Sequence, residues 1–391
     1  MIRYNSAKMA EVKQALSQFT SKLYDQISAE QGGNLQNVLL SPVSIYTACL
    51  MALAGADGVT KTEMLNALCI SKEGTSEALH QTFGSNLMEY FKPTAGVDVS
   101  IANRMFLLKE AKIVEAYEQT LAKYYEASAE KLNALKDLEA MRQHMNKWVE
   151  KQTKEKIKDL LPHGALSNDT TLVLMNALYF KGFWKEEFNK MHTHEEDFHC
   201  LDGSKMKVSM MFKEEKYPFV ELQEFDALAL KLPFRGTNWE MLIVLPNQQA
   251  GLPNLVTELR KEGKLAAILN SNFIEEKVML NLPKFKLDVK DPINLKSHLS
   301  ACGMKSLFSD SADLTKMCTD PRLYIQSAYH KAVLEVDESG ATAAAATGMV
   351  AVAMCFIPKP EFRVNKPFFV AIVCDKTVPV FIGHVVKPEL L

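Results

Sequence analysis

The residues of this chain that could carry out chemistry most directly lie between positions 192 and 200. The segment His192-Thr-His-Glu-Glu-Asp-Phe-His-Cys200 contains three imidazoles and one thiol, all of which bind zinc in other proteins. Its spacing matches no familiar zinc site, and strand alternation would place successive side chains on opposite faces. We therefore expect a surface strand or loop without a metal, and a zinc site is the alternative.

The sequence contains none of the short motifs of the common enzyme classes. GxSxG, GxxxxGK[ST], GxGxxG and HExxH are all absent, so the usual hydrolase, phosphate-binding, dinucleotide-binding and zinc-protease signatures are missing. No spacing pairs a nucleophile with a base. We therefore expect that the protein is not an enzyme and needs no cofactor.

A basic helix face is the remaining candidate for a binding site. The lysines at 147, 151, 154, 156 and 158 share a predicted helix and the residues that follow it. Glu150, Glu155 and Asp159 lie between them, so a solvated helix surface is expected and a polyanion site is the alternative. The predicted helix Ser76–Tyr90 has few basic residues, which does not support a heparin site there.

Composition describes a globular chain with a large core. The 391 residues are 47% hydrophobic and 24% charged, and no repeat or linker divides them, so we expect one domain over residues 1–391. The net charge of −2 argues against a general affinity for nucleic acids. The apolar run Met349–Ile357 is among the longest and is far too short to span a bilayer.

The N-terminus and the cysteines both bear on the compartment. The first residues contain no apolar segment of the kind found in secretory signals, so a cytoplasmic location is expected, with export as the alternative. Seven cysteines occur without a CxxC pair, which suits reduced thiols. One sequon, Asn168-Asp-Thr170, matters only if the chain is exported.

The predicted elements change along the chain from helices to strands. Helical spacing of apolar residues predicts helices at Met9–Ile27, from Ser41-Pro42 onward, and at Lys61–Leu68, Ser76–Tyr90, Ile113–Tyr124, Asp137–Thr153, Asn254–Leu269 and Asn294–Cys302. Strand patterns occur at Thr170–Phe180, Tyr217–Leu222, Asp226–Pro233, Trp239–Leu245, Val278–Leu287, Tyr329–Glu335, Phe362–Val373 and Val378–Val386. This order predicts an α+β architecture with large antiparallel sheets.

A long connection between two predicted strands is the most unusual feature. The segment Glu338-Ser-Gly-Ala-Thr-Ala-Ala-Ala-Ala-Thr-Gly-Met-Val-Ala-Val-Ala-Met354 is uncharged after Glu338 and rich in small side chains. A compact domain rarely contains so long a connection without a function. Its four consecutive alanines favour a helix, but Gly340 and Gly348 would limit that helix to about seven residues, which is marginal by itself.

Several motifs, spread over nearly the whole chain and in the same order, resemble those of the serpin family of serine protease inhibitors. They are Asn37-Val-Leu-Leu-Ser-Pro-Val-Ser-Ile-Tyr46, Gly55-Ala-Asp-Gly-Val-Thr-Lys-Thr-Glu63, Asn146-Lys-Trp-Val-Glu-Lys-Gln-Thr153, Asn176-Ala-Leu-Tyr-Phe-Lys-Gly-Phe-Trp184, Leu282-Pro-Lys284, His330-Lys-Ala332, Asn365-Lys-Pro-Phe368 and Pro379-Val-Phe-Ile-Gly383. In lacking a signal segment the chain resembles the intracellular, ovalbumin-type branch. The resemblance implies a single domain with eight or nine helices, three mainly antiparallel sheets and an exposed reactive loop at about 338–361.

The resemblance also assigns roles to individual residues. A polar network where the main sheet opens is expected from Ser41, Ser44, Asn176 and His330, and Trp184, Lys284 and Glu338 are expected where the loop enters the sheet. The hinge corresponds to Glu338, Gly340, Ala341, Thr342, Ala343, Ala344, Ala345, Ala346 and Thr347. Thr342 stands where glutamate is frequent in the family.

In the serpin mechanism, the target protease would bind the loop as a substrate and cleave it. The family spacing from Glu338 places the reactive bond between Met354 and Cys355, with Ala353 as the alternate position. After cleavage the tethered enzyme would be trapped as its acyl-enzyme while the hinge inserts into the main sheet. Met354 and the small residues before it suit elastase-like or chymotrypsin-like proteases.

Two functions are therefore expected from the resemblance. The first is irreversible, suicide-substrate inhibition of a serine protease by a monomer that forms a covalent complex. The alternative is a non-inhibitory serpin with a carrier, storage or chaperone role. Non-inhibitory members often carry bulky, charged or proline residues in the hinge, and none occurs between Gly340 and Thr347.

Overall fold

The computed structural model describes residues 2–71, 76–92, 94–133, 137–319, 323–339 and 359–391, with the side chains of residues 2–7 left aside. Among these residues the α-helices are α1 (Ile2–Glu30), α2 (Pro42–Gly55), α3 (Gly58–Ala67), α4 (Ser76–Met88), α5 (Glu115–Tyr125), α6 (Leu138–Gln152), α7 (Leu252–Leu259), α8 (Lys264–Leu269) and α9 (Leu295–Ala301). The strands are β1 (Val38–Leu40), β2 (Val97–Leu107), β3 (Ala129–Lys131), β4 (Leu172–Gly182), β5 (His194–His199), β6 (Lys205–Leu222), β7 (Ala227–Pro233), β8 (Trp239–Pro246), β9 (Ile274–Pro283), β10 (Phe285–Leu287), β11 (Ile293–Asn294), β12 (Ile325–Val336), β13 (Glu361–Arg363), β14 (Phe368–Cys374) and β15 (Val378–Val385).

One sheet has six strands in the order β10-β12-β4-β2-β3, with β11 beside β12. β2 and β4 pair antiparallel along eleven residues each, whereas β4 and β12 run parallel. The parallel pair joins segments about 150 residues apart, for example Asn176 opposite His330. The neighbours β4 and β12 are therefore joined by ladder bonds and side-chain contacts, without a hairpin between them.

The second sheet has nine strands, in the order β1-β15-β14-β8-β7-β6-β9-β13 with β5 against β6. The fold class α+β is confirmed. Two of the three predicted sheets are joined here because β6 is 18 residues long and pairs with β7 at one end and with β5 and β9 along the rest.

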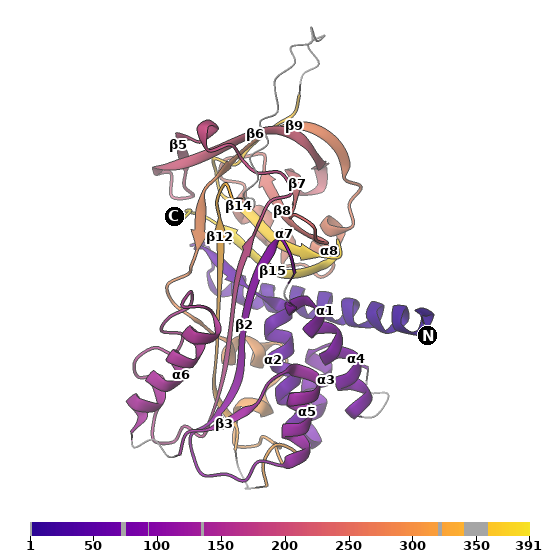
Figure 1. Ribbon diagram of the computed structural model, residues 1–391, viewed down its shortest axis with the longest axis vertical. Coiled ribbons are helices and arrows are strands. Elements are labelled where there is room, and N and C mark those ends of the chain that lie inside the picture. The colour runs from indigo at the N-terminus through magenta and orange to yellow at the C-terminus, as the bar shows by residue number, and fades with distance from the viewer. Residues whose placement is uncertain (1, 72–75, 93, 134–136, 320–322, 340–358) are drawn as a thin grey trace.

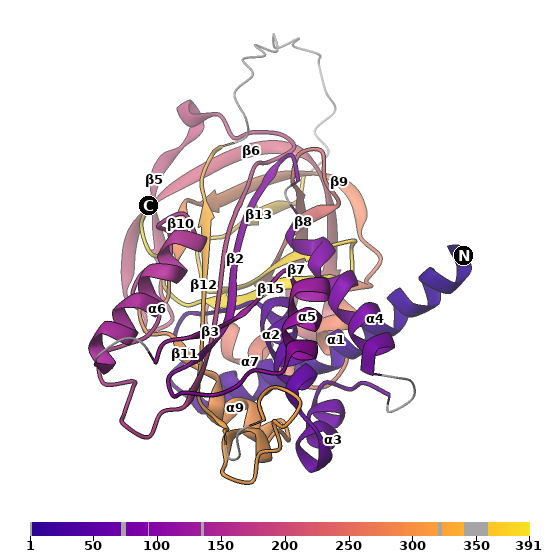
Figure 2. The ribbon, with the colours of Figure 1, turned by 60° about the horizontal axis from the view of Figure 1, so that its bottom comes forward.

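The helices cover the six-stranded sheet unequally. α6 lies against one face, over a small apolar cluster that includes Met145 and Val149 of the helix and Val333 of β12 (Figures 1 and 2). α2, whose residues are nearly all buried, contacts β4 and β15 and belongs to the larger cluster shared with the nine-stranded sheet. Sliding a new strand between β4 and β12 would therefore take place beneath α6.

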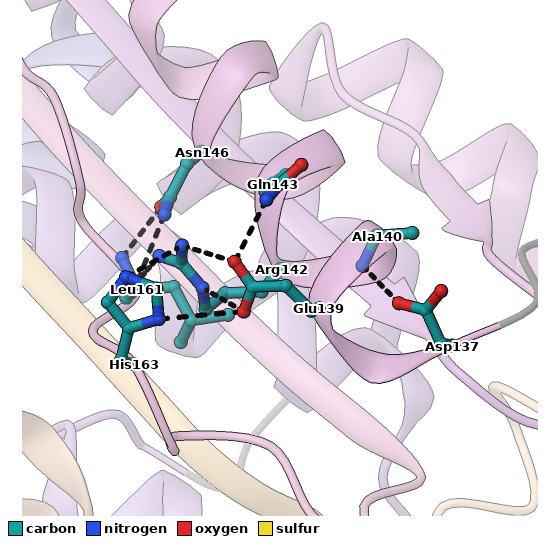
Figure 3. Close-up of polar contacts among 8 residues, drawn as sticks. All are labelled: Asp137, Glu139, Ala140, Arg142, Gln143, Asn146, Leu161 and His163. Carbon is teal, nitrogen blue, oxygen red and sulfur yellow. Dashed lines mark hydrogen bonds and ion pairs between the residues drawn. The ribbon is translucent and has the colours of Figure 1, made fainter.

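Polar contacts bind the chain that follows α6 back onto the helix, as Figure 3 shows. Asn146 exchanges two hydrogen bonds with Leu161: its amide donates to the carbonyl at 2.9 Å, and its oxygen accepts from the backbone N–H at 2.7 Å. Arg142 donates to the same carbonyl and to Glu139. Since these side chains are buried or half-buried, α6 and the connector to residue 161 behave as one unit.

The predicted helices agree with the structure where a capping residue or a regular spacing of apolar residues defines the helix. Helices were predicted correctly for α3, α4, α5, α6 and α9, within a few residues at each end. Ser41 caps α2 as expected: its side chain accepts from the backbone N–H of Ser44 at 3.2 Å, and Pro42 occupies the first turn.

Several predicted elements were wrong in their extent: Met9–Ile27 is only part of α1, and Tyr217–Leu222 is only the end of β6. The predicted helix Asn254–Leu269 is two helices, α7 and α8, separated at Gly263, whose φ of +77° ends helical geometry. The predicted strand Val278–Leu287 is divided between β9 and β10, which belong to different sheets. Phe362–Val373 is likewise divided into β13 and β14 around Pro367, which cannot donate a ladder bond.

Candidate functional site

Polar side chains from three strands and from the start of α2 meet at the six-stranded sheet. Asn103 of β2, Asn176 of β4 and His330 of β12 lie opposite one another in register, and Ser41 and Ser44 approach them from the start of α2. Four of the five, Ser41, Ser44, Asn176 and His330, are completely buried. We call these five residues the central network. The sequence predicted four of them and missed Asn103, because strand register cannot be read from a local pattern.

The hydrogen bonds of the central network cross the line between β4 and β12. Nε2 of His330 accepts from the backbone N–H of Ser41 at 3.1 Å, so the neutral ring carries its proton on Nδ1. Nδ1 donates to Oδ1 of Asn176, whose amide donates to Ser44 Oγ at 2.6 Å and also to Asn103. Burial lowers the pKa of His330 to about 3, so the network is uncharged near neutral pH.

A second group of contacts lies at the end of β12, where the chain enters the hinge. The indole N–H of Trp184 donates to the carbonyl of Asp337 at 2.8 Å, and its ring stacks on Phe234 with centroids 4.8 Å apart. Lys284 lies 2.8 Å from a carboxylate oxygen of Glu338, and Thr193 donates to the other oxygen at 2.9 Å. The three residues predicted at this point thus lie close together, and Thr193 and Asp337 add contacts that the sequence did not predict.

Glu338 is held as a carboxylate although it is nearly buried. Burial tends to raise its pKa, but hydrogen bonds from Lys284, from its own backbone and from Thr193 outweigh it, so the pKa lies below the usual value. The backbone carbonyl of Glu338 also accepts from the N–H of Phe188 at 3.3 Å. The last described residues before the hinge are therefore anchored by both side chain and backbone.

Two lysines after α6 bind to acidic residues on either side of β4. Asp98 of β2 and Glu335 of β12 both lie opposite Lys181 of β4. Lys154 pairs with Asp98 at 2.5 Å, and Lys156 pairs with Glu335 at 2.9 Å. Lys154 and Lys156 of the predicted basic face therefore already form ion pairs with the sheet. This favours the solvated surface over a polyanion site.

We call the contacts of Lys154, Lys156 and Lys284 with their acidic partners the rim contacts. The phenol of Tyr179 also donates to Glu335, at 3.3 Å, and the ammonium of Lys156 lies 5.1 Å from the ring centre of Tyr179. The Lys156–Glu335 pair therefore connects the α6 unit to β12 at the end of the strand that leads to the hinge.

The predicted reactive residues lie outside the described residues. These are Gly340, Ala341, Thr342, Ala343, Ala344, Ala345, Ala346 and Thr347 of the hinge, and Ala353, Met354 and Cys355 at the reactive bond. The described chain stops at Ser339 and resumes at Lys359, which pairs with Glu214 of β6 at 2.6 Å.

The histidine segment forms strand β5 and one flanking turn on each side. His194 and His199 are its end residues, and Cys200 is buried just beyond. Among the described residues, no three His, Cys, Asp or Glu side chains lie close enough together to hold a metal ion. In that same part of the chain, no helix combines the length and apolarity needed to cross a bilayer.

Comparisons with known proteins agree over almost the entire length. The family model "Serpin (serine protease inhibitor)" matches residues 14–388. Human Serpin B4 is 34% identical over 97% of this chain and 100% of its own length, and the leukocyte elastase inhibitor of Xenopus laevis is 32% identical over 97% and 100%.

A solved structure shares the fold as well. The crystal structure of Serpin48 from the insect Tenebrio molitor, described as a highly specific serpin, superposes with a TM-score of 0.85 at 28% identity, covering 97% of this chain and 99% of that one. The relatives named here are inhibitors or serpins by name, and none is named as an enzyme. The chain therefore belongs to the serpin family of serine protease inhibitors.

Proposed function

We propose that this serpin is an irreversible suicide-substrate inhibitor of an elastase-like or chymotrypsin-like serine protease. The observation that carries the proposal is the parallel pairing of β4 with β12, together with the small side chains that follow β12 in sequence. A chain that turns back after Ser339 and enters between these two strands would run antiparallel to both. One parallel ladder would then be replaced by two antiparallel ladders, which are slightly more stable per residue.

The free energy from such an insertion is of the required size. Slowing deacylation of the trapped protease by about a million-fold needs about 8 kcal/mol. The net gain of one ladder, roughly a dozen hydrogen bonds at ~0.5–1.5 kcal/mol each, is of this order before apolar burial is counted. Fifteen inserted residues would carry the protease about 50 Å along the sheet.

For the hinge and reactive-bond residues we propose the roles predicted from the sequence. Gly340 supplies backbone freedom, and Ala341 to Thr347 are small and uncharged, so they can be buried between strands at little desolvation cost. We propose cleavage between Met354 and Cys355, with Ala353 as the alternate position. Release of Trp184 from Asp337 and of Lys284 from Glu338 would accompany the first step of insertion.

The oligomeric state and the cellular compartment can also be proposed. We propose a single domain over residues 1–391 that acts as a monomer, and a reactive loop at about 338–361. The six cysteines among the described residues are unpaired, which suits the reducing cytoplasm. α4 contains no lysine or arginine, so we propose no heparin site there.

The test is to mix the protein with elastase or chymotrypsin and to separate the products on a denaturing gel. A band near the summed masses supports covalent trapping, and the released C-terminal fragment should begin at Cys355. Ala341→Arg should abolish the covalent band and leave cleavage intact, because a charge cannot be buried between β4 and β12 without a partner. Two clean fragments without an adduct, from the parent protein, would favour the non-inhibitory alternative.

A further inference from the structure

A lysine and a cysteine touch on the surface, away from the hinge and the sheet opening. Nζ of Lys22, in α1, lies 3.1 Å from Sγ of Cys69, which follows the end of α3. The two residues are 47 positions apart, so the contact joins two separate elements. Lys22 is exposed and Cys69 is partly exposed, so a small oxidant in solvent can reach the sulfur.

The backbone holds Cys69 in one position. Its φ of +57° is the left-handed geometry that glycine usually supplies just after a helix. The N–H of Cys69 donates to the carbonyl of Asn66 at 3.2 Å, and the N–H of Ile70 donates to that of Leu65 at 2.9 Å. The preceding carbonyl, of Leu68, accepts from the phenol of Tyr46 at 2.9 Å. The thiol is therefore presented to α1 by a turn that is bonded on both sides.

Two other thiols lie near this pair and are poorer nucleophiles. Cys302 follows α9, and the next residue, Gly303, packs close to Ala67 at the end of α3. Burial raises the pKa of Cys302 to about 11, although Lys22 acts in the opposite direction. Burial also raises the pKa of Cys49 well above its ordinary value. Both stay protonated near neutral pH, and the thiolate is the reactive form.

We propose that Cys69 is an oxidation site whose sulfenic acid is captured by Lys22, giving a covalent Sγ–Nζ bond between the end of α3 and α1. In the first step the sulfur attacks one oxygen of hydrogen peroxide. The O–O bond breaks, Cys69 becomes a sulfenic acid, and the departing hydroxide leaves as water. The sulfur is oxidised by two electrons and the peroxide is reduced by two.

The second step is a substitution without further oxidation. The amine of Lys22, after losing one proton to solvent, attacks the sulfur as the S–O bond breaks. The hydroxyl leaves as water with a second proton from the nitrogen, and a sulfenamide remains. An excess of a small thiol would break the S–N bond and restore both side chains. Because an amine is already in contact with the sulfur, capture should compete well with further oxidation.

The test treats the purified full chain with hydrogen peroxide at neutral pH and follows it by intact and peptide mass spectrometry. We expect a product lighter by two hydrogens, with Lys22 and Cys69 in one cross-linked peptide and no tryptic cleavage after Lys22. Dithiothreitol should reverse both changes. The cross-linked protein should melt a few degrees higher, because the link constrains the unfolded chain.

Two variants separate this proposal from its alternatives. Lys22→Arg keeps the positive charge but lacks a nucleophilic amine, so it should give no link and should accumulate sulfinic acid at Cys69. Cys302→Ser should cross-link as the parent chain does. A Cys69–Cys302 disulfide, a link heavier by one oxygen, or equal sulfinic acid in the parent and in Lys22→Arg would each overturn the proposal.

Discussion

The central network and two of the rim contacts, Lys156–Glu335 and Lys284–Glu338, connect β12 or the residues just after it to their surroundings, but they do so by different physics. The central network is buried and uncharged, and each of its members satisfies another. The rim contacts are ion pairs: the lysine is solvent-exposed in the Lys154–Asp98 and Lys156–Glu335 pairs, whereas Glu338 is only 6% exposed in its pair with Lys284. A buried neutral network is costly to disrupt, because its remaining members lose their partners, whereas exposed ion pairs contribute little and weaken with salt.

This difference suggests that the two sets of contacts act at different steps of loop insertion. The exposed Lys154–Asp98 and Lys156–Glu335 pairs can exchange with water at low cost, so they suit an early step. The central network lies deeper along the β4–β12 line and would set the larger barrier to parting the strands.

The largest effect is expected for Asn176→Leu. The substitution removes the acceptor of His330 and the donor to Ser44 and Asn103, and leaves the buried His330 and Ser44 unsatisfied at about 1–3 kcal/mol each. We expect a loss of at least about 3 kcal/mol in the free energy of unfolding, measured by urea denaturation. Asn146→Leu removes the two hydrogen bonds between α6 and Leu161 and should also destabilise the protein, so the two variants compare the central network with the contacts that hold α6 to its connector.

A pH dependence follows from the buried histidines. The folded-state pKa of His330 is about 3 and that of His384 about 4, both lowered by burial, while the unfolded values are near 6.5. Between these values the unfolded chain binds more protons, so stability should be complete above pH 6.5 and should fall as the pH drops below it. Each histidine contributes up to about 1.4 kcal/mol per pH unit over that window.

Thermal melts from pH 7.5 to pH 4.5 measure this dependence. His330→Gln should lower stability at neutral pH and flatten the slope by the contribution of one histidine. An unchanged slope in this variant would mean that His330 is already protonated in the folded protein.

Lys284→Gln should have a moderate effect. Glu338 is only 6% exposed and would keep Thr193 as its remaining side-chain donor, so its carboxylate would be poorly compensated. We expect a loss of about 1–2 kcal/mol at pH 7 in urea denaturation, partly recovered at lower pH as Glu338 protonates. If the whole loss of stability persisted at pH 4.5, it would come from altered packing and not from the uncompensated charge of Glu338.

Lys156→Gln should have the smallest effect on stability and a clear kinetic one. The Lys156–Glu335 pair is partly exposed and should contribute about 0–1 kcal/mol. If it restrains β12 under the α6 unit, its loss should speed insertion of a synthetic hinge peptide at low salt and make that rate less dependent on salt.

Lys158→Gln is the matched control, because Lys158 pairs with Glu150 of α6 and not with the sheet. Equal rates of peptide insertion for the two variants would mean that the Lys156–Glu335 pair does not restrain β12.

Much of the local structure could be predicted from short-range chemistry. The Ser41-Pro42 start of α2 and the periodic helices are set by capping and by apolar spacing within a few residues. Errors arose where a glycine or proline breaks an element. Val278–Leu287 was predicted as one strand, yet the chain leaves one sheet for the other at Pro283.

The residues of the candidate site also fall into those that could be predicted from the sequence and those that could not. Ser44, Asn176 and His330 were found through the resemblance to serpins, whereas Asn103 and the Asp98 and Glu335 partners of the lysines were missed. No motif marks Asn103: it faces Asn176 only because β2 pairs with β4 in one register. A shift of one residue would turn it to the other face of the sheet.

The sequence by itself determined the family, the helices and most strands, and the small, uncharged composition of the hinge, because these depend on side-chain type and local spacing. Only the tertiary structure decided that β12 lies parallel to β4, that Asn103 completes the central network, and that Lys22 reaches Cys69. Each depends on which distant segments become neighbours. That choice is made by the packing of the whole core, since no local preference distinguishes one strand partner from another.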